Sequence, residues 1–218
     1  MKNIVIAIDG PAGAGKSTIA KILAKRLNII YIDTGAMYRA FTYKFLKNNK
    51  SIEDKEAIKE MLDNTEIDFR NNHIFLDGKI VDNEIRKNKV SKNVSNIAKI
   101  KEVREKLVLL QRKIANNKSV VMDGRDIGSN VFPDADYKFF INASAQERGT
   151  RRYKELEKKG TSIKLENIIN EIKQRDKIDS TRKLAPLTKT EDAIEINTTD
   201  LTIEETIEKV LSNIRERG

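Results

Sequence analysis

Residues 10–17 read Gly-Pro-Ala-Gly-Ala-Gly-Lys-Ser and match the phosphate-binding pattern G-x-x-x-x-G-K-[ST]. The glycines let the backbone curl so that successive N–H groups point at phosphate oxygens, and a following helix adds the positive end of its dipole. We expect Lys16 to reach the β- and γ-phosphates of a nucleotide and the Ser17 hydroxyl to face Mg²⁺. The pattern predicts a nucleotide site but leaves its use open, because motors, switches and kinases share this loop.

Arginines at four separated places in the chain suit a second phosphate group. Two phosphorylated substrates repel each other, and guanidinium groups offset this repulsion because they are always charged and pair with phosphate through two hydrogen bonds. For any one arginine, a role as a surface charge or in a structural ion pair explains the residue as well as phosphate binding does. Together with the loop, however, the four sets favour a kinase with a phosphorylated acceptor. The sets are Arg148 with Arg151 and Arg152 on one predicted helix face, Arg175 with Asp179 and Arg182 on another, Arg39 beside Tyr38, and Arg104 at the border of an apolar face.

The segment Asp-Gly-Arg-Asp at 123–126 follows an apolar run that predicts a buried strand. Ligands of doubly wound sheets bind beyond the carboxyl ends of the strands. We therefore expect Asp123 to orient Mg²⁺ through its water ligands and Arg125 or Asp126 to contact substrate, with a plain turn as the alternative. Asp179 is also a candidate ion-pair partner for Arg182 or Arg175, which does not exclude substrate binding.

The elements that must position these residues alternate between strands and helices. Apolar runs predict five strands of a parallel sheet covered by helices on both sides, at 3–8, 29–32, 119–122, 137–141 and 193–197. Residues 66–81 instead alternate apolar and polar residues around Asn71-Asn72 and Asp77-Gly78, which predicts a small antiparallel sheet. Helices are expected over 51–63, 100–115, 145–159 and 162–177. Another helix is expected to begin after Thr34 as its N-cap, and the helix that follows Gly160 has Thr161 or Ser162 as its cap. The last helix is expected to begin with a capping box formed by Thr202 and Glu205.

The composition limits the size of the domain, the kinds of partner and the location that we expect for this protein. The chain has 218 residues, enough for one α/β domain, and a formal net charge of +9 that attracts nucleic acid, anionic membrane or phosphorylated metabolites. The arginine positions favour the metabolites. The absence of cysteine excludes disulfides and thiolate catalysis. No apolar run approaches the ~20 residues needed to span a bilayer. We expect a cytoplasmic protein without a signal peptide.

Several segments, taken in order, resemble bacterial cytidylate kinases. The Asp-Gly-Arg-Asp and Asp-Thr-Gly-Ala-Met-Tyr-Arg segments are much more specific than the phosphate loop, and the resemblance covers essentially the whole chain. The matching segments are Ile-Asp-Gly-Pro-Ala-Gly-Ala-Gly-Lys-Ser-Thr at 8–18, Asp-Thr-Gly-Ala-Met-Tyr-Arg at 33–39, Asp-Gly-Arg-Asp-Ile-Gly at 123–128, Val-Phe-Pro-Asp-Ala at 131–135, Glu147-Arg148 with Arg151-Arg152, the segment 175–182, and Ala-Pro-Leu at 185–187.

The resemblance implies one P-loop NTPase-type domain over residues 1–218, with a five-stranded parallel sheet sandwiched by helices. A small acceptor-binding insertion with antiparallel strands would cover 34–98, and a short lid 148–162. The implied activity transfers the γ-phosphate of ATP to CMP or dCMP, giving CDP or dCDP and ADP in pyrimidine nucleotide metabolism, with Mg²⁺ as cofactor. The protein would be a monomer that binds no nucleic acid and no membrane.

The resemblance also implies roles for individual residues. Arg125, Asp126, Asp179 and Ser95 would read cytosine and ribose, and Arg39, Arg104 and Arg182 would hold the CMP phosphate. The full implied sets are Lys16, Arg148, Arg152 and Asp123 for catalysis; Gly10, Pro11, Ala12, Gly13, Ala14, Gly15, Lys16, Ser17, Thr18 and Arg151 for ATP; Thr34, Tyr38, Arg39, Ser95, Arg104, Arg125, Asp126, Arg175, Asp179 and Arg182 for CMP; and Ser17 for Mg²⁺.

Two residues depart from the family pattern, and other functions stay open. Thr34 stands where family members often have serine, with little expected consequence because both carry a hydroxyl. Gly149 is an interior glycine expected to loosen the lid helix. The acceptor could instead be UMP or AMP. A basic RNA-binding NTPase is a further alternative, although no RNP-type aromatic motif is present, and a purely structural role would leave the loop unexplained.

Overall fold

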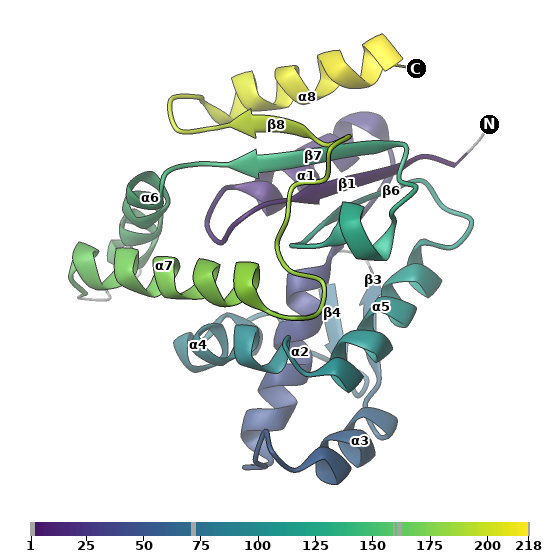
Figure 1. Ribbon diagram of the computed structural model, residues 1–218, viewed down its shortest axis with the longest axis vertical. Helices are drawn as coiled ribbons and strands as arrows, with labels where there is room; N and C mark the ends of the chain where they lie inside the picture. Colours follow the sequence, from purple (N-terminus) through teal and green to yellow (C-terminus); the bar gives the residue numbers. More distant parts are fainter. Residues whose placement is uncertain (1–2, 71–72, 159, 161–162, 218) are drawn as a thin grey trace. The chain divides into compact units, whose positions relative to one another are not determined.

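A computed structural model describes the chain apart from residues 1–2, 71–72, 159, 161–162 and 218 (Figure 1). The chain forms two compact units. The first consists of Met1–Tyr31 with Lys118–Gly218, and the second of Ile32–Asn117. The insertion expected at 34–98 falls inside the second unit.

A five-stranded parallel sheet forms the centre of the first unit, in the order β2-β6-β1-β7-β8. β1 lies between β6 and β7 and runs parallel to both, and β8 runs parallel to β7. Ile6, Ile8 and Phe139 are almost completely buried, as expected for apolar strands covered on both faces. All five expected strands are confirmed, as β1 (Val5–Asp9), β2 (Ile30–Asp33), β6 (Val120–Asp123), β7 (Tyr137–Asn142) and β8 (Ile194–Asn197).

Helices pack around this sheet. α1 (Lys16–Leu27) contacts β1, β6 and α8 (Ile203–Arg217), while α6 (Ala145–Glu157) and α7 (Leu165–Thr181) pack side by side (Figure 1). A short π-helix, η2 (Ile127–Val131), follows β6. The expected capping box of α8 is confirmed, since the Glu205 N–H donates to Thr202 Oγ1 at 3.2 Å and the Thr202 N–H donates to Glu205 Oε2 at 2.8 Å.

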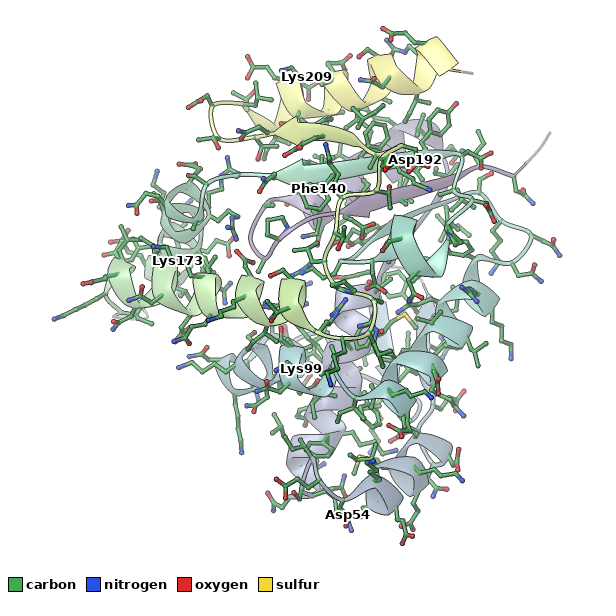
Figure 2. All side chains as sticks on the ribbon, in the orientation of Figure 1. Asp54, Lys99, Phe140, Lys173, Asp192 and Lys209 are labelled. Carbon is green, nitrogen blue, oxygen red and sulfur yellow. The ribbon has the colours of Figure 1, made fainter. Side chains whose placement is uncertain are left out.

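α7 differs from the helix expected at 162–177, because it begins at Leu165 and continues to Thr181, one turn beyond the expected end. The expected caps Thr161 and Ser162 lie outside the described residues. Asp192, labelled beside the sheet in Figure 2, ties the segment after α7 to the sheet. Its Oδ2 accepts a hydrogen bond from Lys138 Nζ of β7 at 2.6 Å.

The second unit contains the expected antiparallel sheet, formed by β3 (Ile67–Arg70), β4 (His73–Leu76) and β5 (Lys79–Ile80). Asp77 and Gly78 have φ angles of 48° and 77°, and positive angles at both positions are typical of a two-residue hairpin turn. The other expected turn, Asn71-Asn72, lies outside the described residues. His73 opens β4, and its Nδ1 lies 2.6 Å from Asp82 Oδ2 at the exposed surface.

The helix of the second unit that carries Thr34, Tyr38 and Arg39, α2 (Thr34–Lys47), packs against β3, β4 and the helices around them. Its predicted N-cap is wrong by one residue. Asp33 caps the helix by accepting the Ala36 N–H at 2.8 Å, and Thr34 is the first helical residue. A carboxylate is favoured there because it meets the positive end of the helix dipole. The other helices are α3 (Lys55–Asp63), η1 (Glu84–Arg86), α4 (Asn88–Ile97) and α5 (Lys101–Ala115).

Candidate active site

The phosphate loop connects β1 to α1 as the sequence predicts. Gly10, Gly13 and Gly15 have φ angles of 146°, 76° and 87°, conformations that L side chains rarely adopt. Gly10 has a second constraint, because a Cβ there would lie 2.0 Å from the Ile141 carbonyl oxygen. Gly15 is the N-cap of α1, so the open N–H groups of the first helical turn adjoin the loop.

Lys16 is buried beside the loop and is only 5% exposed. Its Nζ donates a hydrogen bond to the Pro11 carbonyl oxygen at 2.7 Å. Burial lowers the pKa of the Lys16 ammonium well below its usual range, and the charges of Arg125 and Arg175 lower it further, while Asp123 opposes the change. A phosphate anion beside the ammonium would favour its charged form. The environment of Lys16 therefore suits an anionic ligand.

Ser17 and Asp123 form a pair of oxygen donors next to the loop. Ser17 Oγ donates to Asp123 Oδ2 at 2.8 Å, and the Tyr31 hydroxyl donates to Asp123 Oδ1 at 2.8 Å. Within the described part of the chain, no group of three or more His, Cys, Asp or Glu residues could hold a metal. A hydroxyl with one carboxylate fits Mg²⁺, which proteins usually bind through one or two carboxylates, waters and substrate phosphates.

Two ion pairs, one buried and one partly buried, join the segment after β6 to the end of α7. Arg125 Nε donates to Asp179 Oδ2 at 2.9 Å, and Arg182 donates to Asp126 Oδ1 at 3.0 Å. Asp179 and Arg182 are 3% and 7% exposed. The sequence suggested Arg182 or Arg175 as partner of Asp179, and the structure adds Arg125. The remaining arginine, Arg175, lies near enough to Lys16 for its charge to lower the lysine pKa.

The three arginines of α6 have different surroundings, although their spacing predicts a shared face. Arg148 is buried and donates to the Ala12 carbonyl oxygen at 2.8 Å. Arg151 donates to the Thr198 carbonyl oxygen at 2.7 Å, and its Nη1 lies 4.0 Å from where a Cβ on Gly15 would be. Arg152 pairs with Glu155 at 3.0 Å and its side chain is 39% exposed. Arg148 and Arg151 therefore adjoin the phosphate loop, whereas Arg152 lies at the surface.

Asp9 is a buried acid that the sequence analysis missed. Its two carboxylate oxygens accept the backbone N–H groups of Ile127 and Gly128 at 2.8 and 2.7 Å. Burial raises the pKa of Asp9 to about 6, although these hydrogen bonds lower it in part. Asp9 thereby fixes the start of η2 directly after Asp126. An acid that ends an apolar strand run was the available signal.

The second unit holds its own group of predicted site residues. The Arg104 guanidinium lies 5.5 Å from the centre of the Tyr38 ring and donates to the Ala98 carbonyl oxygen at 3.1 Å. Arg39 Nη1 lies 3.1 Å from where a Cβ on Gly35 would be, in the first turn of α2. Tyr38, Arg104, Thr34 and Ser95 are all buried. One guanidinium group in the first turn of α2, with a second beside Tyr38 of the same helix, is chemistry suited to an anion.

The parallel sheet, the loop between β1 and α1 and the arginines beside it define a P-loop nucleotide-binding protein. The family model for cytidylate kinase matches residues 6–216. The chain belongs to the cytidylate kinase family.

Individual relatives agree with the family match. A cytidylate kinase of Clostridioides difficile (strain 630) is 59% identical over 214 residues, which cover 98% of this chain and 99% of the relative. A cytidylate kinase of Alkaliphilus oremlandii (strain OhILAs) is 55% identical and covers 99% of each chain.

Solved structures at low sequence identity share the fold. A shikimate kinase from Bacteroides thetaiotaomicron has a TM-score of 0.51 at 13% identity, with 97% of this chain and 98% of that chain covered. An uncharacterized protein from Eubacterium ventriosum ATCC 27560 has a TM-score of 0.54 at 18% identity, with 99% of each chain covered. The expected fold class is confirmed. In the described part of the chain, no helix is both long and apolar enough to cross a membrane.

Proposed function

We propose that this protein transfers the γ-phosphate of ATP to CMP, giving ADP and CDP. The observation that carries the proposal is the 59% identity to a cytidylate kinase along 98% of the chain. The site chemistry supports it, since a phosphate loop with a buried lysine suits ATP and several arginines suit a second phosphorylated substrate.

On the donor side, we assign residues 10–18 and Arg151 to ATP. The loop N–H groups and the N-terminus of α1 would bind phosphate oxygens, and Lys16 would stabilise the charge that develops on the transferred group. Ser17 would hold Mg²⁺ directly and Asp123 through its waters. When bound, Mg²⁺ neutralises phosphate charge and orients the phosphate chain.

On the acceptor side, we assign to CMP the residues that the family resemblance implies. Arg39, Arg104 and Arg182 would bind its phosphate, while Arg125 and the remaining residues would bind the nucleoside. Buried charged groups suit recognition of a polar base. A base that cannot form hydrogen bonds to them would leave these groups without partners, and would therefore bind more weakly. The remaining residues assigned to CMP are Thr34, Tyr38, Ser95, Asp126, Arg175 and Asp179.

The reaction needs no general base, because the CMP phosphate oxygen that attacks is already anionic near neutral pH. That oxygen forms a bond to the γ-phosphorus as the bond to the β–γ bridging oxygen breaks, and ADP leaves with the electron pair. The protein's contribution is in-line positioning and electrostatic stabilisation, which we assign to Lys16, Arg148 and Arg152. Closure of the lid at 148–162 would exclude water and suppress ATP hydrolysis.

ADP release measured across CMP, dCMP, UMP and AMP tests the proposal. We expect the highest kcat/KM with CMP or dCMP and little ADP without an acceptor. A Lys16→Ala preparation purified in parallel controls for contaminating kinases. Equal use of all four monophosphates would refute the assignment of CMP. Acceptance of dCMP, a monomeric state and a cytoplasmic location stay predictions, which the same panel, gel filtration and cell fractionation would check.

A further inference from the structure

The Asp176 carboxylate, on α7, contacts two separate parts of the first unit. Its Oδ1 accepts a hydrogen bond from the Ala12 backbone N–H at 3.2 Å, and its Oδ2 accepts one from the Arg148 guanidinium at 2.6 Å. The side chains of Asp176 and Arg148 are 21% and 6% exposed. One carboxylate therefore joins α7, α6 and the phosphate loop.

The peptide unit between Pro11 and Ala12 is held at both of its polar groups. Its carbonyl accepts a hydrogen bond from Lys16 Nζ at 2.7 Å, and its N–H donates to Asp176 at 3.2 Å. Because a peptide unit is planar and trans, its C=O and N–H point in opposite directions, and rotation of the unit breaks both bonds together. Asp176 thus fixes the acceptor of the Lys16 ammonium without touching Lys16.

The next peptide unit is fixed through Arg148. The Ala12 carbonyl oxygen accepts a hydrogen bond from Arg148 Nη1 at 2.8 Å, and Arg148 Nε donates to the Ala143 carbonyl oxygen at 2.8 Å. The same Nη1 donates to Asp176. Removing one member of a largely buried ion pair leaves the other uncompensated. Loss of Asp176 would therefore disturb Arg148 as well as the loop.

The charge of Asp176 argues against a direct role in phosphate binding. A carboxylate beside a phosphate-binding loop opposes an anionic ligand by charge repulsion. The guanidinium of Arg148, 2.6 Å away, compensates this charge. What Asp176 supplies is the orientation of the groups around it.

We propose that Asp176 is a positioning residue for the phosphate donor, which fixes the peptide unit between Pro11 and Ala12 and orients Arg148. The identity of the donor as ATP rests on the proposed function. Because Lys16 and the loop serve the donor, loss of Asp176 should weaken donor binding and turnover and leave acceptor binding nearly unchanged.

The test compares Asp176→Ala, Asp176→Asn and a matched control, Glu166→Gln, which neutralises an exposed carboxylate of the same helix. The Kd of a non-hydrolysable ATP analogue is measured without acceptor, and KM for ATP and CMP with kcat is measured by ADP release. For Asp176→Ala we expect Kd and KM for ATP to rise about 10-fold or more, as for loss of a charged hydrogen-bond partner, with KM for CMP changed less than about twofold. Asp176→Asn should lie between, because it keeps an acceptor for Ala12 and loses the charge. Glu166→Gln should match the wild type.

Two results would overturn the proposal. One is wild-type analogue affinity and kcat in Asp176→Ala. The other is an equal rise in KM for both substrates, which indicates general loosening. If Asp176→Ala does not fold by circular dichroism, Asp176→Asn decides by the same criteria. Analogue binding needs no acceptor, so this test stands even if the monophosphate panel shows no preference for CMP.

Discussion

Replacing Gly149 with alanine tests the packing of α6 on α7. A Cβ on residue 149 would lie 2.4 Å from Ile169 Cγ1, 3.5 Å from Cδ1 and 3.6 Å from Cα. A carbon contact under 3.0 Å is essentially never seen for a Cβ, so Ile169 must move. Its branched side chain has few χ1 choices in a helix. Gly149 therefore has a packing role, whereas the sequence interpretation gave it only a loosening one.

The expected effect of Gly149→Ala is the difference between two opposing contributions. Alanine is favoured over glycine in a helix interior by about 0.5–1 kcal/mol. Overpacking a well-filled contact costs about 1–3 kcal/mol. We expect a net loss of about 1–2 kcal/mol in the free energy of unfolding, measured by urea denaturation followed by circular dichroism. Activity should also fall, because α6 carries Arg148 and Arg151.

An Ile169→Ala background supplies the control. That change removes Cγ1 and Cδ1 and leaves Cα, at 3.6 Å, as the nearest of the three contacts. In this background Gly149→Ala should stabilise the protein by about 0.5–1 kcal/mol, because only the helix preference remains. The effect of one methyl group should thus change sign. Stabilisation in the wild-type background, or equal destabilisation in both, would refute the reasoning.

Two further predictions concern charged residues. Lys16→Ala and Arg152→Ala should each lower kcat by about 10²-fold or more while shifting the thermal midpoint little, and near-normal turnover in both would contradict the assigned roles. The native pKa of Asp9 is raised from 3.8 to about 6, so the stability linked to its protonated form is complete below 3.8 and is lost as the pH rises through about 6. The free energy of unfolding of the wild type minus that of Asp9→Asn should therefore fall by about 2–3 kcal/mol between about pH 4 and pH 7. Urea titrations across this range check it, and a difference that does not vary with pH would contradict it.

Local patterns predicted the elements of the fold well, but not every helix. The five parallel strands and the small antiparallel sheet were readable because burial on one or two faces leaves a regular sequence pattern. α4 was missed although Val90, Val94 and Ile97 recur at helical spacing and are buried. The N-cap of α2 was placed one residue late, because Asp33 and Thr34 are both good caps and only the backbone conformation separates them.

The candidate site was predictable in residue type and less so in pairing. Sequence spacing suggested one shared face for the arginines of α6, yet Arg148 is buried against Ala12 and Arg152 pairs at the surface with Glu155. Long side chains pair with whichever groups lie nearby in the fold, and for Arg148 two of those groups, Ala12 and Asp176, are distant in sequence. Asp176 is a further example, because it accepts a hydrogen bond from the N–H of Ala12, which is 164 residues away in the sequence.

The buried charges of the first unit argue for preorganisation and against a stabilising role. Burying an ion pair removes two charges from water, and the loss often equals or exceeds the attraction between them, so an apolar replacement of the same volume is commonly as stable. Even so, Lys16, Asp126, Arg148, Asp179 and Arg182 are each at most 7% exposed. A fold that needed only stability would gain little from these groups. Donors held in fixed directions within a low-dielectric site are, however, what stabilisation of a transferring phosphate requires, because they need no reorganisation when charge develops. We infer that the rest of the fold offsets the cost of burying these charges, and that the groups are retained because their fixed orientation suits phosphate transfer.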